Sequence, residues 1–178
     1  MILYIAQSLD GFIAGKNGNV SFLDQFSLEE LTDHDYHSFY ENIDTTCMGN
    51  NTYKQVKGFG VPFPYVGKEN YVFTRNPAAG KEKHVRFVSD DVAEFVNEQK
   101  AKDGKNIWLI GGSELNSYFL EKGLIDEIWL FIAPVPLGEG IPLFRSFSKR
   151  ADFRPVKSKT YPSRMVLIHF EVAYTSEK

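Results

Sequence analysis

The chain has 178 residues, of which 43% are hydrophobic and 24% are charged. This length predicts one domain, and the composition excludes an intrinsically disordered, collagen-like or coiled-coil chain. The net charge of −3 comes from 20 basic and 23 acidic side chains without a long run of one sign, which argues against a nucleic-acid-binding protein.

The sequence has a single cysteine, Cys47, which excludes an intrachain disulfide and a structural zinc site built on thiolates. One unpaired thiol is typical of a reducing compartment. The first residues, MILYIAQSLDG, lack the basic segment and the apolar core of a secretory signal, and no stretch is long and apolar enough to span a bilayer. These features predict a cytoplasmic protein with no membrane partner.

The first quarter of the chain predicts a strand, a loop and a helix. Residues 2–6 form a short apolar run, and the Ser-Leu-Asp-Gly sequence at 8–11 closes it, as expected of a buried strand followed by a turn. Residues 15–27 contain several turn formers and predict a loop. A helix with a partial apolar stripe is expected to follow, capped by Ser27 or Asp33.

Two further strands and a second helix are predicted before residue 105. The β-prone runs 45–49 and 71–74 are each followed by turn-forming residues. Apolar side chains recur at helical spacing over residues 92–99. They predict a helix with Ser89 as its N-terminal cap and Gly104 at its C-terminal end.

The clearest pattern lies between residues 106 and 134, where two apolar runs flank a helix-forming segment with one apolar face. This order predicts a βαβ unit with parallel strands. Residues 152–175 predict two antiparallel strands joined by a turn at 161–163. The expected fold is α/β, in one domain spanning residues 1–178, with a mixed, mostly parallel sheet flanked by helices and a C-terminal antiparallel hairpin.

The strongest functional signal is Gly111-Gly112-Ser113-Glu114 at the predicted strand-to-helix junction. Two residues without Cβ let a ligand approach the backbone where the free N–H groups of a helix point, which suits a phosphate group. The alternative is a structural turn in which Ser113 only caps the helix. The sequence matches neither a Walker loop nor a GxGxxG motif.

Two other predicted strands end in residues suited to the same ligand. Small and hydrogen-bonding residues follow the second strand at 48–52, and Thr74 and Arg75 follow the third. Ligands in open α/β sheets bind at the carboxyl edge of the strands. Arg75 could form two hydrogen bonds to a phosphate, although an isolated arginine is more often a solvated surface residue.

Other candidates for chemistry are few. Asp10 follows the first strand, where a substrate pocket could use its carboxylate, but Asp-Gly is also a common turn sequence. The four histidines are scattered and do not predict a metal site. Ser113 lacks the G-x-S-x-G context of a nucleophile, and Cys47 is expected inside a buried strand.

Several segments together resemble the dihydrofolate-reductase-like superfamily. They are SLDGFIAG, DYHSFYENID, MGNNTYKQV, YVFTRNP and IWLIGGSELNSYFLEKGLIDEIWLFIAPVPLGEGIPLF, in this order along nearly the whole chain. The sequence looks most like the branch related to the reductase domain of the bifunctional riboflavin-pathway deaminase/reductase. The resemblance implies an eight-stranded mixed sheet with NADPH bound across the carboxyl ends of its strands.

The resemblance also implies roles for named residues. Asp10, with Gly11, would border the nicotinamide and the substrate, and Asp10 is the candidate catalytic residue. The expected cofactor contacts are Gly49, Asn50, Asn51 and Thr52 at the adenosine-side phosphates, Thr74 and Arg75 at the 2′-phosphate, and Gly111, Gly112, Ser113, Glu114 and Leu115 at the pyrophosphate.

Two departures from the family pattern affect the expected ligands. The family usually has Met-Gly-Arg-Lys/His-Thr where this chain has Asn50-Asn51, so two positive charges are missing and NADH is not excluded. Folate reductases carry a carboxylate on the preceding helix, and here Asp33 or Asp35 lies at about the right separation without the usual flanking pattern.

The expected activity is NAD(P)H-dependent reduction of a planar heterocycle, of the 5-amino-6-(5-phosphoribosylamino)uracil reductase type. Dihydrofolate reduction and a non-catalytic nucleotide-binding module on the same fold are the alternatives. A homodimer is expected because the C-terminal hairpin leaves a long sheet edge and because relatives of the riboflavin branch tend to pair.

Overall fold

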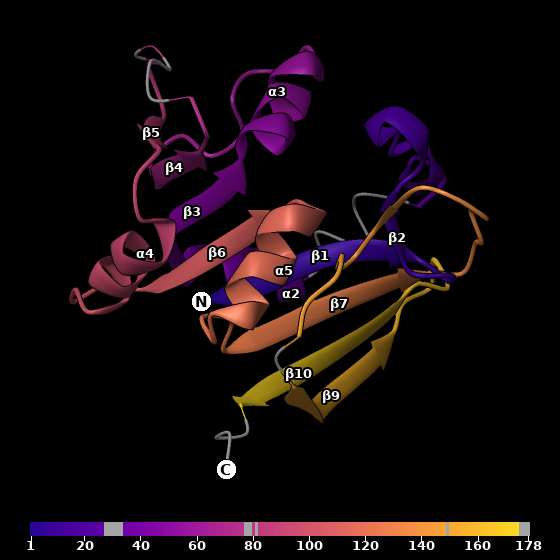
Figure 1. Ribbon diagram of the computed structural model, residues 1–178. Helices are drawn as coiled ribbons and strands as arrows, with labels where there is room; N and C mark the ends of the chain where they lie inside the picture. Colours follow the sequence, from indigo (N-terminus) through magenta and orange to yellow (C-terminus); the bar gives the residue numbers. More distant parts are fainter. Residues whose placement is uncertain (27–33, 77–79, 81, 149, 175–178) are drawn as a thin grey trace.

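The computed structural model describes residues 1–26, 34–76, 80, 82–148 and 150–174. Within these residues the centre of the molecule is an eight-stranded sheet. Across the sheet the strands follow the order β5 (Arg86–Val88), β4 (Glu69–Phe73), β3 (Ile43–Gly49), β6 (Asn106–Gly111), β1 (Ile2–Ser8), β7 (Glu127–Ala133), β10 (Val166–Tyr174) and β9 (Ala151–Thr160) (Figure 1).

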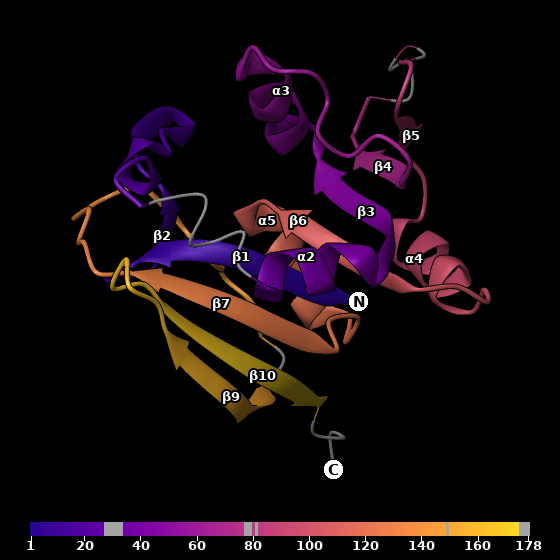
Figure 2. The ribbon, with the colours of Figure 1, turned by 180° about the vertical axis from the view of Figure 1, so that it is seen from behind.

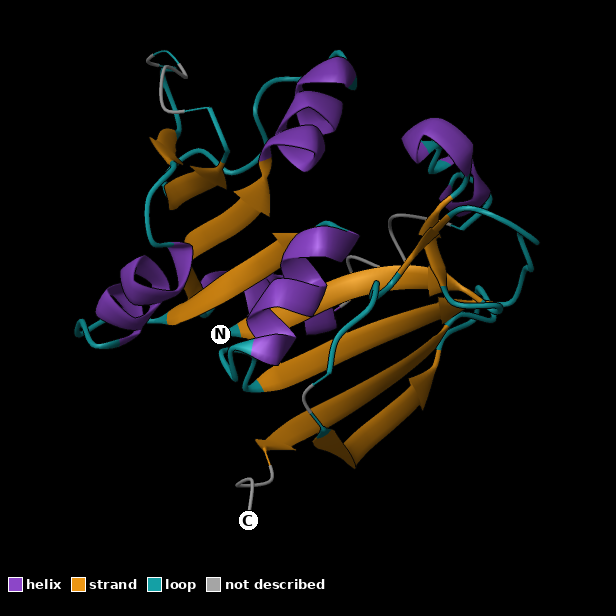
Figure 3. Ribbon diagram, in the orientation of Figure 1, coloured by secondary structure: helices purple, strands orange, loops and turns teal. Residues whose placement is uncertain are grey.

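Neighbouring strands from β5 to β7 are parallel, whereas β10 runs antiparallel to β7 and to β9. The predicted fold class, a mostly parallel mixed sheet with a C-terminal antiparallel hairpin, is therefore confirmed. Figure 3 shows the strands as one curved layer with helices on its two faces.

The apolar run of β6 is continuous because both faces of this central strand are covered. Successive side chains of a strand point to opposite faces. Ile107 and Leu109 pack in the cluster formed with α4 (Val92–Lys100) and α5 (Ser113–Glu121). Trp108 and Ile110 pack on the other face, toward α2 (His34–Glu41) and α3 (Asn50–Gly58). Figure 2 shows α2 in front of the sheet when the molecule is seen from behind.

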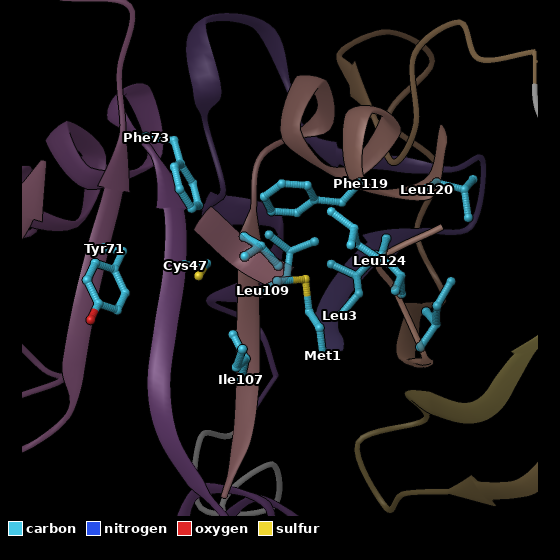
Figure 4. Close-up of a cluster of buried hydrophobic side chains, with 13 residues drawn as sticks. Met1, Leu3, Cys47, Tyr71, Phe73, Ile107, Leu109, Phe119, Leu120 and Leu124 are labelled. Atoms are coloured by element: carbon cyan, nitrogen blue, oxygen red, sulfur yellow. The ribbon is translucent and has the colours of Figure 1, made fainter. Parts of the chain in front are cut away.

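The core beneath α5 holds this helix firmly against the sheet. Phe119 is completely buried and meets Phe73 edge to face, with ring centroids 5.6 Å apart. Leu3 and Leu109 are also fully buried in the same cluster, which Figure 4 shows in close-up. Because α5 cannot shift without opening this core, the junction of residues 111–113 has a defined position.

Both predicted ends of α4 are wrong. The helix begins at Val92, and its cap is Asp91, whose carboxylate accepts a hydrogen bond of 3.0 Å from the Glu94 N–H; Ser89 is too far upstream. The helix ends at Lys100 with Ala101 as its C-cap. Gly104 lies beyond it, where a Cβ would come within 2.6 Å of an oxygen of Asp44, so close packing explains this glycine.

The N-terminal region differs in part from the expected loop and helix. Two short 3₁₀ turns occupy Lys16–Gly18 and Ser21–Leu23, and the next described helix, α2, begins at His34. The proposed caps Ser27 and Asp33 lie outside the described residues. The sequence also did not predict α3, because only two of its residues, Tyr53 and Val56, are buried.

A second small sheet pairs β2 (Phe12–Ala14) with β8 (Ile141–Pro142). Strands this short carry no detectable periodicity, so the sequence did not predict them. Gly140 permits the pairing, because a Cβ at this position would lie only 2.2 Å from the Ala14 carbonyl oxygen. This pair ties the segment after β7 to the segment after β1.

The hairpin of β9 and β10 turns at the predicted residues 161–163 and forms one edge of the sheet. The edge strand β9 carries Pro155, and the register shifts between His169 and Phe170 on β10. Proline and irregular register both hinder pairing with another strand. In the part of the chain that the structure describes, no helix has the length and apolar character needed to cross a membrane.

Candidate functional site

The carboxyl ends of the parallel strands bring the predicted motifs to one edge of the sheet. The helix α3 begins directly after β3, and α5 begins after β6, the strand next to β3. Thr74 and Arg75 follow β4, on the other side of β3. Figure 1 shows the first turns of α3 and α5 at the tips of their strands.

The N-termini of α3 and α5 share a feature that favours anions. Their N-caps are Gly49 and Gly112, both in extended conformation, and glycine has no side chain that could accept a hydrogen bond from the first N–H groups of the helix. The first N–H groups of a helix have no intrahelical acceptor and form its positive end. Two such ends beside one another can bind the phosphates of a single ligand.

Small residues at the two helix starts let the motifs approach closely. A Cβ at Gly112 would lie 3.3 Å from Oγ1 of Thr52, so these two residues of different motifs are near neighbours. Gly111 has a φ of +113°, a value that favours glycine, and a Cβ there would lie 3.3 Å from Oδ1 of Asn116. The two glycines therefore let the start of α5 pack closely against Thr52 and Asn116.

Two buried polar atoms at this junction lack partners. Ser113 is not the helix cap, as the structural alternative required, but the first residue of α5. Its Oγ and the Oδ1 of Asn116 have no hydrogen-bond partner among the described residues, although both side chains are buried. Leaving such atoms unpaired costs about 1–3 kcal/mol each. A ligand at the start of α5 would be able to satisfy the Ser113 hydroxyl.

An ion pair links Arg75, which follows β4, to Glu114 in the motif at the start of α5. The guanidinium of Arg75 lies 3.9 Å from the carboxylate of Glu114, which also lies 3.4 Å from the guanidinium of Arg145. The Arg75 side chain is 97% exposed. Leu115, the last residue predicted at the pyrophosphate, packs against the core with its side chain, so only its backbone could contact a ligand.

A cavity of about 570 Å³ lies between α3 and the strands β4 and β5. Of the predicted cofactor residues, Asn50 and Thr74 line it, and Asn51 and Arg75 do not. Lys54, one turn after Asn50, also lines this cavity and was not predicted. The signal that could have identified it is the four-residue spacing from Asn50, which places both side chains on one helix face.

Asp10 lies at the same edge, after β1, but its carboxylate is already engaged. It accepts hydrogen bonds from the Ser8 hydroxyl at 2.6 Å, from the Leu137 N–H at 3.0 Å and from the Gly138 N–H at 2.6 Å. These contacts, with that of Ser8 foremost, lower the pKa of Asp10 to about 2. The group is therefore an ionised hydrogen-bond acceptor at neutral pH, and it holds the segment after β7 in place.

The segment that contains Leu143 and Arg145 is held against α5 by two polar side chains that the sequence did not indicate, those of Asn116 and Ser117. The Asn116 amide donates to the Leu143 carbonyl oxygen at 3.0 Å, and the Leu143 N–H donates to the Gly11 carbonyl oxygen at 2.9 Å. The Ser117 hydroxyl accepts from the Arg145 N–H at 2.6 Å. The sequence signal that could have identified Asn116 and Ser117 is the presence of two adjacent polar residues on the otherwise apolar face of a helix.

No group of three or more side chains suited to a metal ion occurs among the described residues. The cysteine is buried in β3, as predicted, and burial raises the pKa of the Cys47 thiol to about 12.

Residues 65–167 match the family model described as the RibD C-terminal domain. Two proteins of Bacillus subtilis (strain 168) are similar over almost the whole chain, and both are described as uncharacterized. YwjB is 38% identical over 169 residues, which cover 95% of either chain, and YyaP is 36% identical over 180 residues, which cover 94% of this chain and 92% of YyaP.

Solved structures share the fold. A protein from Shewanella sp. PV-4, assigned to riboflavin biosynthesis, is 28% identical with a TM-score of 0.84, and the match covers 97% of this chain and 98% of that one. The deaminase/5-amino-6-(5-phosphoribosylamino)uracil reductase of Thermotoga maritima, 19% identical with a TM-score of 0.73, matches 97% of this chain and 56% of its own length.

Proposed function

The chain belongs to the RibD C-terminal domain family, and we propose that it is an NAD(P)H-dependent reductase of the 5-amino-6-(5-phosphoribosylamino)uracil reductase type. The resemblance to riboflavin-pathway reductases supports the reaction class, and the carboxyl edge of the sheet supports a dinucleotide ligand. The free thiol at Cys47 is consistent with the further proposal of a cytoplasmic location.

The observation that carries the proposal is the pair of helix N-termini with glycine N-caps, together with the unsatisfied Ser113 hydroxyl in the first turn of α5. The N-terminal N–H groups of α3 and α5 would hold the phosphates of the cofactor, and the Ser113 hydroxyl would donate to one of them. Gly112 would let the pyrophosphate approach the backbone, since any larger residue would face Thr52 there. The residues present therefore fit the cofactor.

A bound nicotinamide cofactor supplies the hydride, and the protein supplies orientation and electrostatics. Asp10 is proposed to act beside the nicotinamide as an acceptor for a hydroxyl or amino group of the substrate, because its pKa of about 2 leaves it without a proton to donate at neutral pH. Its hydrogen bonds to the Leu137 and Gly138 N–H groups would also keep the substrate end of the site closed on one side.

Dihydrofolate reduction is the weaker alternative, and the environment of Asp35 is the reason. A folate site needs a carboxylate on the helix before β3 that is free to bind the pterin ring. The Asp35 carboxylate accepts hydrogen bonds from Lys157 at 2.8 Å, from Lys159 at 2.7 Å and from the Tyr161 hydroxyl at 2.8 Å. The Asp35 side chain is only 13% exposed and is tied to the C-terminal hairpin, whereas Asp10 is exposed, which favours a pyrimidine over a folate.

The test has two steps that separate the three functions. In the first step the purified protein is titrated with NADPH and with NADH, and the change in cofactor fluorescence measures binding. Oxidation of the bound cofactor is then followed with 5-amino-6-(5-phosphoribosylamino)uracil or with dihydrofolate as substrate. Turnover with the pyrimidine supports the proposal, turnover with dihydrofolate alone supports the folate alternative, and binding without any turnover supports a nucleotide-binding module. A protein that binds neither cofactor refutes all three.

A further inference from the structure

The cavity beside α3 has one apolar side and one polar side. Tyr53 and Phe87 line it with their rings, whose centroids lie 5.7 Å apart in an edge-to-face arrangement. Its polar lining residues are Asn50, Lys54, Lys57, Thr74, Asn76 and Glu82. A cavity of about 570 Å³ with this lining can hold a flat base together with a charged substituent.

The two lysines that line this cavity, Lys54 and Lys57, differ in whether their charge is already paired with a carboxylate. Lys57 donates to the Glu82 carboxylate at 2.9 Å, so its charge is compensated. Lys54 forms no ion pair or hydrogen bond with any described residue, and its side chain is exposed toward the cavity that it lines. Among the described lysines of this cavity, Lys54 is therefore the one whose charge is left for a ligand.

Arg75, the cation expected from the sequence, does not line this cavity. Its guanidinium lies near Glu114 at the start of α5. A carboxylate beside it competes with any phosphate for the same charge. The motif residues Asn50 and Asn51 carry no charge at all, so neither they nor Arg75 provide the cation of this cavity.

We propose that Lys54 recognises the 2′-phosphate of the cofactor and makes the protein prefer NADPH to NADH. This inference rests on the proposed function, since it concerns the adenosine end of the same cofactor. The phosphate would lie between the Lys54 ammonium, the Asn50 amide and the Thr74 hydroxyl. The Thr74 oxygen accepts a hydrogen bond of 3.1 Å from the Asn76 N–H, which leaves the hydroxyl proton available for the phosphate.

The experiment compares two fragments of the cofactor, adenosine 2′,5′-bisphosphate and adenosine 5′-monophosphate, by titration calorimetry. In Lys54→Gln we expect affinity for the bisphosphate to fall at least about tenfold, because one charge-assisted contact is lost. Affinity for the monophosphate should change by less than about twofold, as expected where no contact is removed. Lys54→Arg should keep most of the preference, and added salt should weaken the bisphosphate contact in the wild type.

Lys83→Gln is the matched control, because Lys83 is an exposed neighbour of the same charge that does not line this cavity. It should leave both affinities unchanged. Equal losses for the two fragments in Lys54→Gln, or a selective loss in Arg75→Ala and not in Lys54→Gln, would overturn the assignment. A wild-type protein that binds NADPH and NADH equally overturns the inference and leaves the reductase proposal standing, whereas one that binds neither overturns both.

Discussion

The role of Asp35 can be decided by replacing its carboxylate with an amide. The side chain is only 13% exposed and joins α2 to β9 and to the hairpin turn through its contacts with Lys157, Lys159 and Tyr161. Asp35→Asn removes the charge with little change of shape. If the carboxylate serves the fold, the variant loses stability; if it serves a pterin substrate, the variant loses activity.

The expected loss of stability follows from the exposure of the three partners. The lysine side chains are 48% and 33% exposed, so solvent screening leaves each ion pair below about 1 kcal/mol. Tyr161 is buried, and a hydrogen bond to a charged acceptor contributes about 1.5–3 kcal/mol, part of which the amide oxygen keeps. We expect Asp35→Asn to lower the free energy of unfolding by about 2 kcal/mol. The melting temperature should fall by about 4–8 °C.

Urea and thermal unfolding measure this change, with Asp103→Asn as the control. Asp103 is exposed, and no hydrogen bond or ion pair joins it to another described residue, so its variant should stay within about 0.5 kcal/mol of the wild type. A cycle with Tyr161→Phe should show that the two substitutions are coupled. Unchanged stability of Asp35→Asn together with loss of dihydrofolate turnover would refute this reasoning and make Asp35 a substrate-binding residue.

The same carboxylate predicts a pH dependence. Burial alone would raise the pKa of Asp35, but the hydrogen bonds from Lys157, Lys159 and Tyr161 outweigh it and lower the pKa below the ordinary 3.8. A lowered pKa in the folded state adds stability that is fully present above pH 3.8 and is lost as the pH falls below that value. Acid unfolding of Asp35→Asn should therefore depend less steeply on pH than that of the wild type.

Three further predictions concern Asp10, Cys47 and assembly. Asp10→Asn should keep NADPH affinity while turnover falls at least about tenfold, and unchanged turnover would remove Asp10 from the mechanism. Because burial raises the pKa of Cys47 to about 12, a disulfide reagent should leave the native protein unmodified and label one thiol per chain in denaturant; rapid native labelling would contradict the buried position. We expect a homodimer, which uses an apolar face that includes the exposed Phe153 of β9, because Pro155 hinders pairing along the edge. Light scattering should give about twice the chain mass of 20.3 kDa, and a value near 20.3 kDa at micromolar concentration would refute the dimer.

The sequence by itself determined the elements whose signal is local. The apolar run before Gly111, the glycine pair and the amphipathic segment after it predicted β6 and α5, because burial on both faces of a strand or on one face of a helix leaves a short-range pattern. The same reasoning found the hairpin turn at 161–163 and the burial of Cys47. The ends of α4 were missed, because Asp91 and Ser89 are both good caps and only the backbone geometry selects one of them.

Only the tertiary structure decided which side chains meet across long separations. Asp10 and Leu137 are 127 residues apart, and Asp35 and Tyr161 are 126 residues apart, yet these contacts determine whether either carboxylate is free for a ligand. The approach of Arg75 to Glu114 and the place of Lys54 in a cavity depend likewise on the order of β4, β3 and β6 across the sheet. Periodicity reports which face of an element is buried, but the partner of a charged side chain is set by strand order and loop path, which leave no pattern in the neighbouring residues.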